Sequence, residues 1–162
     1  MSKTITVGIS DLNAVKAPDI LVTYALGSCV GICLYDANSR IAGLSHIMLP
    51  DSSQIVGGAS QAMKFADTGI VELLRTMEAM GARRAFIKAK IAGGAQMFAA
   101  MSNSAIANIG SRNVAAVKAV LAEQRIPIIA EDTGKDYGRT LYFSAEDGMM
   151  HIKSGSKGEW VW

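Results

Sequence analysis

The sequence predicts an α/β protein, a layered sandwich in which a mixed, largely antiparallel sheet carries two main helices. Segments with the alternating or continuous apolar pattern of strands outnumber segments with helical spacing. Short polar turns separate several of the strand segments, which is typical of antiparallel hairpins. The expected order of four strands, a helix, a strand, a helix and three strands lacks regular βαβ alternation. A purely parallel sheet is therefore not expected.

The first half of the chain is expected to consist mainly of strands. Residues 11–19 contain Pro18 and are expected to form a connection, and Gly27-Ser28 is expected to end a strand. The polar turn Ala37-Asn38-Ser39 lies between two apolar runs, which predicts a β-hairpin. The expected strands are residues 4–8, 20–26, 29–36 and 40–49.

The second half is expected to contain both helices. Apolar residues recur every three or four positions in residues 60–80 and 111–124, as they do in amphipathic helices. Gly81 is expected to end the first helix and Ser111 to cap the second. The expected loops are residues 54–59 and 132–138. The expected strands are residues 85–91, 127–131, 139–144 and 149–153, of which the last two form a hairpin.

Length and composition are consistent with a single domain that spans residues 1–162. The chain is 50% hydrophobic and 19% charged, which supplies enough apolar surface for a core without disulfides. Its two cysteines, Cys29 and Cys33, lack the Cys-x-x-Cys spacing of many metal and redox sites, and reduced thiols favour the cytoplasm. We therefore expect no metal site and no cofactor. The formal net charge of +2 does not indicate a nucleic-acid partner, and no apolar segment is long enough for a membrane span.

The predicted hairpin brings a thiol and an imidazole to one face. If its turn centres between Ala37 and Asn38, Cys29 faces His46 across the strand pair. A turn with an even number of residues keeps both side chains on one face, whereas an odd number separates them. A neighbouring histidine lowers the pKa of a cysteine thiol and transfers protons for it. The pair therefore favours acyl transfer at an amide or ester, with backbone amides near Gly27-Ser28 available to an oxyanion.

These residues also have ordinary structural interpretations. A cysteine in an apolar strand commonly packs as a small hydrophobic residue, and Cys33 is expected to do so. A single histidine is also commonly structural. Thr23 on the preceding strand could orient the imidazole of His46 through its hydroxyl, or be an ordinary β-branched strand residue. Phe98 could belong to an apolar docking patch or to the core.

Ordered blocks of sequence extend over nearly the whole chain and carry a family resemblance. Those around the predicted hairpin are TYALGSCVG at residues 23–31, Tyr35-Asp36 and GLSHIMLP at residues 43–50. The later blocks are residues 65–70, 90–98, 109–114, 132–134 and 138–139. Together these blocks resemble the CheD family, the chemoreceptor glutamine deamidases of bacterial and archaeal chemotaxis. The sequence departs from the family pattern at Lys135, where a second glycine is expected after Gly134.

The resemblance implies a mechanism and a substrate. It makes Cys29 the nucleophile, His46 the general base and acid, and Thr23 the group that orients His46. The implied reaction is hydrolysis of selected receptor glutamines to glutamate with release of ammonia, and hydrolysis of receptor glutamyl methyl esters stays open. The substrate would be the cytoplasmic helices of chemoreceptors. The expected location is therefore the cytoplasm, at chemoreceptor arrays, without direct insertion into the membrane.

The resemblance also implies a fold and a protein partner. The implied fold is an α/β sandwich similar to that of the bacterial toxin deamidases of the cytotoxic necrotizing factor type. The implied partner is the phosphatase CheC. An apolar patch around Phe98 could be a docking surface for CheC or for the receptor. The alternative hypothesis is a chemotaxis adaptor that mainly binds CheC and does not catalyse a reaction.

Overall fold

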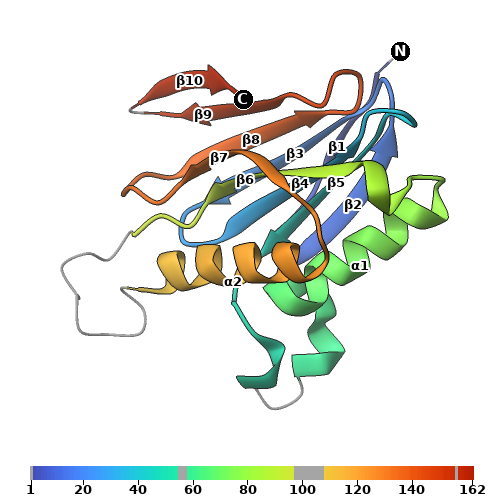
Figure 1. The fold of residues 1–162 in the computed structure, drawn as a ribbon. Coiled ribbons are helices and arrows are strands. Elements are labelled where there is room, and N and C mark those ends of the chain that lie inside the picture. Colours follow the sequence, from blue (N-terminus) through green and yellow to red (C-terminus); the bar gives the residue numbers. More distant parts are fainter. Residues whose placement is uncertain (1, 55–57, 97–107, 156) are drawn as a thin grey trace.

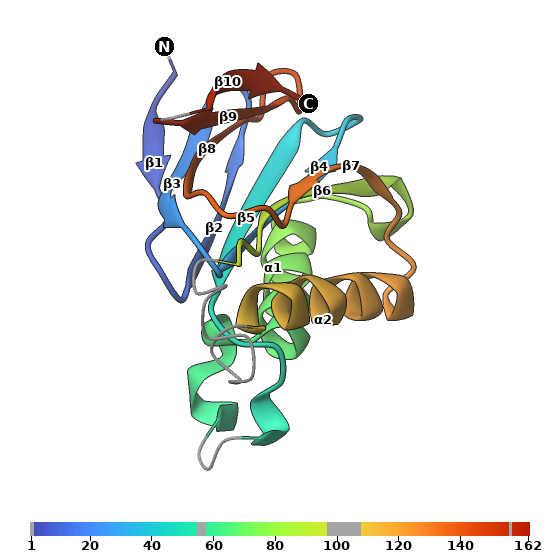
Figure 2. The same ribbon diagram turned by 90° about the vertical axis from the view of Figure 1, so that its left-hand side faces the viewer.

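The computed structural model describes residues 2–54, 58–96, 108–155 and 157–162. Two five-stranded sheets pack against each other, and two α-helices cover the outer face of the second sheet (Figure 1). Figure 2 shows the first sheet and the helices on opposite sides of the second sheet, so the fold has three layers. The helices are α1 (Ala66–Ala79) and α2 (Ile109–Glu123). Short 3₁₀ helices occur at Ser52–Gln54, Gly58–Lys64 and Arg84–Phe86.

Both sheets are mixed and largely antiparallel. In spatial order the first contains β1 (Thr4–Thr6), β3 (Ile20–Leu26), β8 (Arg139–Ser144), β9 (Met150–Ser154) and β10 (Gly158–Val161). The second contains β2 (Asp11–Lys16), β5 (Ile41–Ile47), β4 (Val30–Asp36), β6 (Ile87–Gly93) and β7 (Ile128–Thr133). The pairs β1–β3 and β6–β7 are parallel, and the other neighbours are antiparallel. The predicted α/β class with two helices is confirmed for the described residues, but the strands form two sheets instead of one.

Both faces of the second sheet are buried, which explains the continuous apolar sequence of β4. Ile32 and Leu34 on β4 pack toward the helices. Cys33, between them in sequence, packs with Leu44 and Phe143 in the core between the sheets. Because successive strand residues point to opposite faces, a strand covered on both sides needs apolar residues at nearly every position. The prediction that Cys33 is core material is confirmed.

Helix α1 lies close to β5, and this approach depends on a glycine. A Cβ atom on Gly43 would lie 2.6 Å from the Met77 Sδ of α1. Gly43 and the residues of the same parity therefore face the helix, and the alternate residues of β5 face the first sheet. His46 belongs to the second group, so the helix layer positions its strand while its imidazole lies in the core between the sheets.

Two strands differ from the sequence-based expectation, and both lie at a sheet edge. Strand β2 occupies part of the segment expected to be a connection, and it pairs with β5. Its buried residues, Leu12 and Val15, are three positions apart, so the segment lacks the alternation of a half-buried strand. Strand β10 pairs with β9, and most of its residues are exposed. Backbone pairing defines these strands, and side-chain patterns carry little information about them.

The helix boundaries also differ from those expected. Helix α1 begins at Ala66, because residues 58–64 form a 3₁₀ helix with non-helical angles at Gln61 (φ −122°, ψ 53°). Gly81 follows α1 at φ 113°, a conformation that favours glycine, as predicted. Helix α2 begins at Ile109, and the Ser111 hydroxyl donates to a backbone carbonyl in the turn before it instead of capping the helix. The predicted caps therefore hold at one helix end and fail at the other.

The loop after β7 contains the position at which the sequence departs from the family pattern. Strand β7 extends to Thr133, two residues into the segment expected to be a loop. Lys135 then adopts φ 63°, in the left-handed region where a glycine has no steric penalty. This conformation explains why a glycine is expected there. Within the described ranges, no helix has the length and apolarity that crossing a bilayer requires.

Candidate active site

A buried hydrogen-bond chain joins the two sheets at the imidazole of His46. His46 on β5 and Thr23 on β3 are both fully buried. The Thr23 Oγ1 lies 2.6 Å from the His46 Nδ1 and donates to the carbonyl oxygen of Val7 over 2.7 Å. The three residues come from one strand of the second sheet, one strand of the first sheet and the segment after β1. Only the packing of the two sheets brings them together.

This chain selects one tautomer of the imidazole. A threonine hydroxyl has a single hydrogen, and here the Val7 carbonyl, which can only accept, receives it. The Thr23 oxygen must therefore accept a hydrogen bond from the His46 Nδ1–H. In a neutral imidazole the other nitrogen, Nε2, then carries a free lone pair. The geometry leaves His46 with its basic nitrogen on Nε2.

Burial keeps His46 neutral at physiological pH. Removal of the imidazole from water lowers its pKa from the usual 6.5 to about 4, because the charged form loses its hydration. The His46 Nε2 is buried and has no hydrogen-bond partner among the residues that the structure describes. A buried nitrogen without a partner is unusual, and its lone pair is an available hydrogen-bond acceptor.

Cys29 lies at the start of the strand next to β5 and differs sharply from Cys33. It immediately precedes β4 and is partly exposed, whereas Cys33 is fully buried. Burial raises the pKa of the Cys29 thiol, and a hydrogen bond from its own backbone N–H lowers it in part. Complete burial also raises the pKa of the Cys33 thiol. Of the two thiols, Cys29 is the one that a protein substrate can reach.

The predicted opposition of Cys29 and His46 is wrong by two residues. The structure pairs Gly31 with His46, because the hairpin turn has four residues, 37–40, and Asp36 pairs with Ile41. The Asp36 carboxylate accepts a hydrogen bond from the backbone N–H of Asn38 and so stabilises this longer turn. The shift is an even number of residues, so Cys29 keeps the parity of the face that carries His46.

The two groups are therefore diagonal neighbours at the end of the strand pair. Diagonal positions on one face are about 7–8 Å apart, within reach of a longer side chain but beyond the reach of a thiol at rest. Accordingly, no hydrogen bond joins Cys29 to His46 in the part of the chain that the structure describes.

The loop before Cys29 is held by its carbonyl groups. The Gly27 carbonyl accepts a hydrogen bond from the Ala95 N–H, and the Cys29 carbonyl accepts one from the Gly94 N–H, each over 2.8 Å. The Ser28 carbonyl accepts one from the Asn113 side chain of α2 over 3.0 Å. All three carbonyls of residues 27–29 are thus satisfied by the segment after β6 and by α2.

Two backbone N–H groups of this loop, those of Ser28 and Cys29, point away from the hydrogen bonds that anchor its carbonyls. In a trans peptide the N–H points opposite to the preceding carbonyl, so the N–H groups of Ser28 and Cys29 point away from these anchors. Among the described residues neither N–H donates to another residue, and both residues are partly exposed. Backbone N–H donors beside a thiol can bind an oxyanion. The oxyanion role expected for Gly27-Ser28 stays a prediction.

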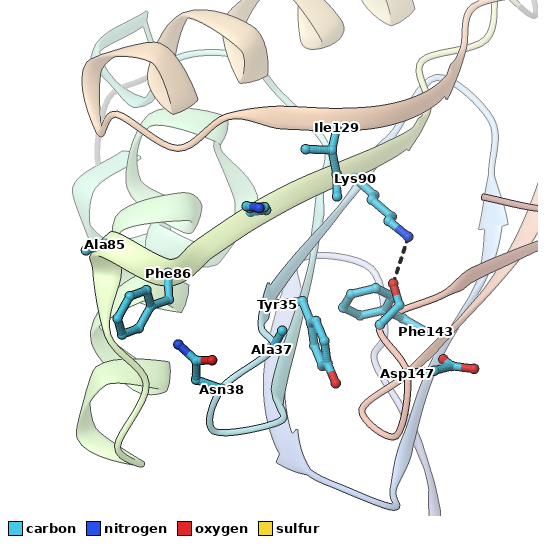
Figure 3. Close-up of a pocket in the computed structure, with 11 residues that line it drawn as sticks. Tyr35, Ala37, Asn38, Ala85, Phe86, Lys90, Ile129, Phe143 and Asp147 are labelled. Carbon is cyan, nitrogen blue, oxygen red and sulfur yellow. Dashed lines mark hydrogen bonds between the residues drawn. The ribbon is translucent and has the colours of Figure 1, made fainter.

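A cavity at the other end of β4 is separate from these residues. Its volume is about 490 Å³, and its lining includes the aromatic rings of Tyr35, Phe86 and Phe143. Figure 3 shows the Lys90 side chain extending from β6 across this cavity to the β8–β9 connection, where it donates to the Gly148 carbonyl. None of Thr23, Cys29 and His46 lines the cavity. The predicted catalytic residues therefore lie outside this cavity, with Cys29 in a partly exposed loop and Thr23 and His46 buried between the sheets.

Comparison with known proteins decides the family. The family model described as "CheD chemotactic sensory transduction" matches residues 48–154. A relative from Lachnoclostridium phytofermentans is 51% identical over 157 residues, which cover 97% of this chain and 97% of that protein. The chain belongs to the CheD family. Relatives from Clostridium novyi (53% identical, 95% of this chain and 94% of the relative) and Syntrophomonas wolfei (49%, 98% of each) are equally similar. All three CheD relatives carry the name "Probable chemoreceptor glutamine deamidase CheD".

The structure of this CheD protein brings only some of the predicted catalytic residues into contact. Thr23 and His46 are hydrogen bonded, and Cys29 lies on their face without contacting Nε2. Phe98 lies outside the described residues. Sequence reasoning missed Asn113, which holds the loop before the cysteine from α2, because an asparagine near a helix start is an ordinary polar residue in sequence. The described residues contain no group of three or more His, Cys, Asp or Glu side chains arranged for a metal ion.

Proposed function

We propose that this protein is a protein-glutamine deamidase that converts selected glutamines of chemoreceptors to glutamate with release of ammonia. The observation that carries the proposal is the Thr23–His46 hydrogen bond, which leaves a basic nitrogen on the face of Cys29 with no partner among the described residues. A binding module has no need of a buried imidazole in this state. The names of the CheD relatives supply the substrate class.

In this mechanism His46 acts first as a base and then as an acid. Its Nε2 accepts the Cys29 thiol proton as the sulfur attacks the carbon of the glutamine carboxamide. The carbonyl oxygen becomes an oxyanion, which accepts hydrogen bonds from the Ser28 and Cys29 N–H groups. The protonated Nε2 then donates its proton to the amide nitrogen, which leaves as ammonia. A thioester joins the cysteine to the substrate at this point.

The second half of the reaction repeats these steps with water. Nε2 accepts a proton from a water molecule as its oxygen attacks the thioester carbon. The carbon–sulfur bond breaks, the product is glutamate, and the thiol regains its proton from the imidazole. A glutamyl methyl ester would react in the same way with methanol as the leaving group, so we propose receptor methyl esters as a second substrate class.

The resting protonation states define what Thr23 contributes. Burial raises the pKa of Cys29 and lowers that of His46 to about 4, so both groups are neutral near pH 7. Proton transfer then accompanies attack, and the imidazolium that forms is buried. The Thr23 oxygen accepts a hydrogen bond from Nδ1–H in both states, and this bond strengthens when the ring is charged. Thr23 thus orients the neutral ring and stabilises the charged one.

The resting distance between thiol and imidazole is compatible with this mechanism. Catalytic hydrogen bonds are often long or absent without substrate and form in the substrate complex. Cys29 ends a loop that is anchored on one side and partly exposed on the other, so rotation about its Cα–Cβ bond moves the sulfur without moving the backbone. A glutamine on the surface of a helical receptor bundle could reach a thiol in such a loop.

Three finer expectations belong to this proposal through the family resemblance. We propose CheC as a protein partner, with Phe98 in the docking patch. We propose that the chain is one domain with a fold related to the deamidases of the cytotoxic necrotizing factor type. We also propose that it acts in the cytoplasm at receptor arrays, because its substrate would be the cytoplasmic helices of receptors.

The direct test is mass spectrometry of a chemoreceptor cytoplasmic fragment after incubation with the protein. Wild type is expected to convert selected glutamines to glutamate, Cys29→Ala to convert none, and Cys33→Ala, the matched control, to retain conversion. Undiminished conversion by Cys29→Ala would refute the mechanism. No conversion by wild type, together with binding of CheC in a pull-down, would favour the adaptor hypothesis instead.

A further inference from the structure

Asn113 bridges the segments that carry the thiol and the imidazole. Its side chain projects from α2 and is fully buried. The Nδ2 donates to the carbonyl of Ser28 over 3.0 Å and to the carbonyl of Met48 over 2.9 Å. Ser28 immediately precedes Cys29, and Met48 follows His46 by two residues. One carboxamide thus spans the two segments beside the site.

The bridge lies where the β4–β5 ladder ends. The last pair of the ladder is Val30 with Ile47, and the Met48 N–H donates instead to the Lys64 carbonyl. The two segments therefore lose their mutual backbone hydrogen bonds one residue before the thiol. The amino group of Asn113 has two hydrogens, and each satisfies one of the two carbonyls beyond the end of the ladder. It replaces the missing ladder contact.

The bridge also orients a backbone donor. The Ser28 carbonyl and the Cys29 N–H belong to one peptide unit, which is planar and trans. Fixing the carbonyl toward α2 therefore directs the Cys29 N–H to the opposite side, where the oxyanion would lie. The Gly27 carbonyl, held by Ala95, fixes the Ser28 N–H in the same way. Asn113 thus controls the donor nearest to the sulfur.

The remaining atom of this side chain argues against a purely structural role. Two neighbouring carbonyls can only accept, so the atom between them is the amide nitrogen, and Oδ1 points elsewhere. Oδ1 is buried and has no hydrogen-bond partner within the described part of the chain. A buried acceptor without a donor lowers stability. If this position of α2 served only packing, an apolar residue would avoid that cost. The hydrogen bonds to Ser28 and Met48 therefore indicate a role besides packing.

We propose that Asn113 is a positioning residue that fixes the Ser28–Cys29 peptide against the end of β5, and so aligns the Cys29 sulfur and N–H with His46. This inference rests on the proposed deamidase function for its consequence in catalysis. The positioning role also predicts an effect on the pKa of the Cys29 thiol, which can be measured without any deamidation. The Cys29 N–H lowers the pKa of its own thiol, so losing the bridge should weaken that effect.

The experiment compares Asn113→Ala with Val117→Ala. Val117 lies one turn further along α2 and is also fully buried, so its variant controls for lost packing of the helix. For each variant we would measure kcat and KM on a receptor fragment and the pH profile of Cys29 alkylation by iodoacetamide. Asn113→Ala is expected to lower kcat about tenfold or more with little change in KM, and to shift the alkylation profile to higher pH. Val117→Ala is expected to lower the melting temperature and leave kcat and the profile unchanged.

The outcomes distinguish failure of the positioning role of Asn113 from failure of the proposed deamidase function. A lower melting temperature of Asn113→Ala with unchanged kcat and alkylation profile would overturn the positioning role, as would equal changes in both variants. If wild type deamidates nothing but the alkylation profile still shifts in Asn113→Ala, the proposed function fails and the positioning of Cys29 stands. If the alanine variant does not fold, Asn113→Gln retains the carboxamide at a displaced position and is expected to give a smaller shift in the same direction; no shift would overturn the role.

Discussion

The buried imidazole of His46 predicts that this protein loses stability on mild acidification. Burial lowers the pKa of His46 from 6.5 to about 4 in the folded state. As the pH falls through this window, the unfolded chain binds a proton that the folded protein does not bind. The free energy of unfolding therefore falls with pH, and this contribution is fully present only above about pH 6.5.

The size of the effect follows from the two pKa values. At about 1.36 kcal/mol per pKa unit, the difference between 6.5 and about 4 limits the total loss to about 3 kcal/mol. Between pH 7 and pH 5 the expected loss is about 2 kcal/mol, because the unfolded chain is almost fully protonated at pH 5 and the folded protein is not. A loss of this size is a large part of the stability of a typical domain.

The assay is urea unfolding of wild type and His46→Gln at pH 7, 6 and 5. Glutamine retains a polar planar group and does not titrate, and all other ionisable residues are the same in both proteins. The stability of wild type relative to the variant is expected to fall by about 2 kcal/mol from pH 7 to pH 5. Parallel pH dependence in the two proteins would refute the reasoning. A nitrogen NMR titration of the imidazole near pH 6.5, or a proton on Nε2 instead of Nδ1, would also contradict it.

Three further predictions concern the site and its support. Thr23→Val removes the acceptor for His46 Nδ1–H and is expected to lower the free energy of unfolding by about 1–3 kcal/mol and to abolish most deamidation. Thr23→Ser should retain both, and equal activity of the two variants in a kinetic assay would contradict the orienting role. In the folded protein iodoacetamide is expected to label Cys29 and spare Cys33, as measured by peptide mass spectrometry, because Cys29 is partly exposed and Cys33 is fully buried. Preferential labelling of Cys33 would contradict the assignment. Gly43→Ala places a Cβ 2.6 Å from a methionine sulfur of α1 and is expected to destabilise the protein by about 1–3 kcal/mol in thermal unfolding without changing the labelling rate; an unchanged melting temperature would show that α1 can shift.

The sequence was most informative where side chains repeat with a regular period. Strands β3, β4 and β5 and the body of both helices lie where the apolar patterns predict them, because burial of one or both faces dictates those patterns. Strands β2 and β10 are different. They are edge strands with few buried side chains, so their existence depends on backbone pairing with strands that are distant in sequence. Local patterns cannot encode such pairing.

Local sequence likewise predicts some features of the candidate site and not others. The residue types and the even parity of the hairpin place Cys29 and His46 on one face, and this follows from local sequence. The two-residue error in their opposition arises at the turn, where hydrogen bonds of the Asp36 carboxylate select four residues instead of two. An aspartate before a polar turn is compatible with either length, so the pattern of apolar residues alone could not choose between them.

The residue pattern of this protein thus predicts its buried strands, the body of both helices, and a cysteine and a histidine on one face of a hairpin. The tautomer of His46, the donors near Cys29 and the bridge from Asn113 arise only when β3, the segment after β6 and α2 converge on the end of the β4–β5 hairpin. Each of these features is a hydrogen bond between residues far apart in the chain. Such bonds depend on distance and angle within a few tenths of an ångström. The packing of the two sheets and the helix layer sets that geometry, and no local pattern of residues records it.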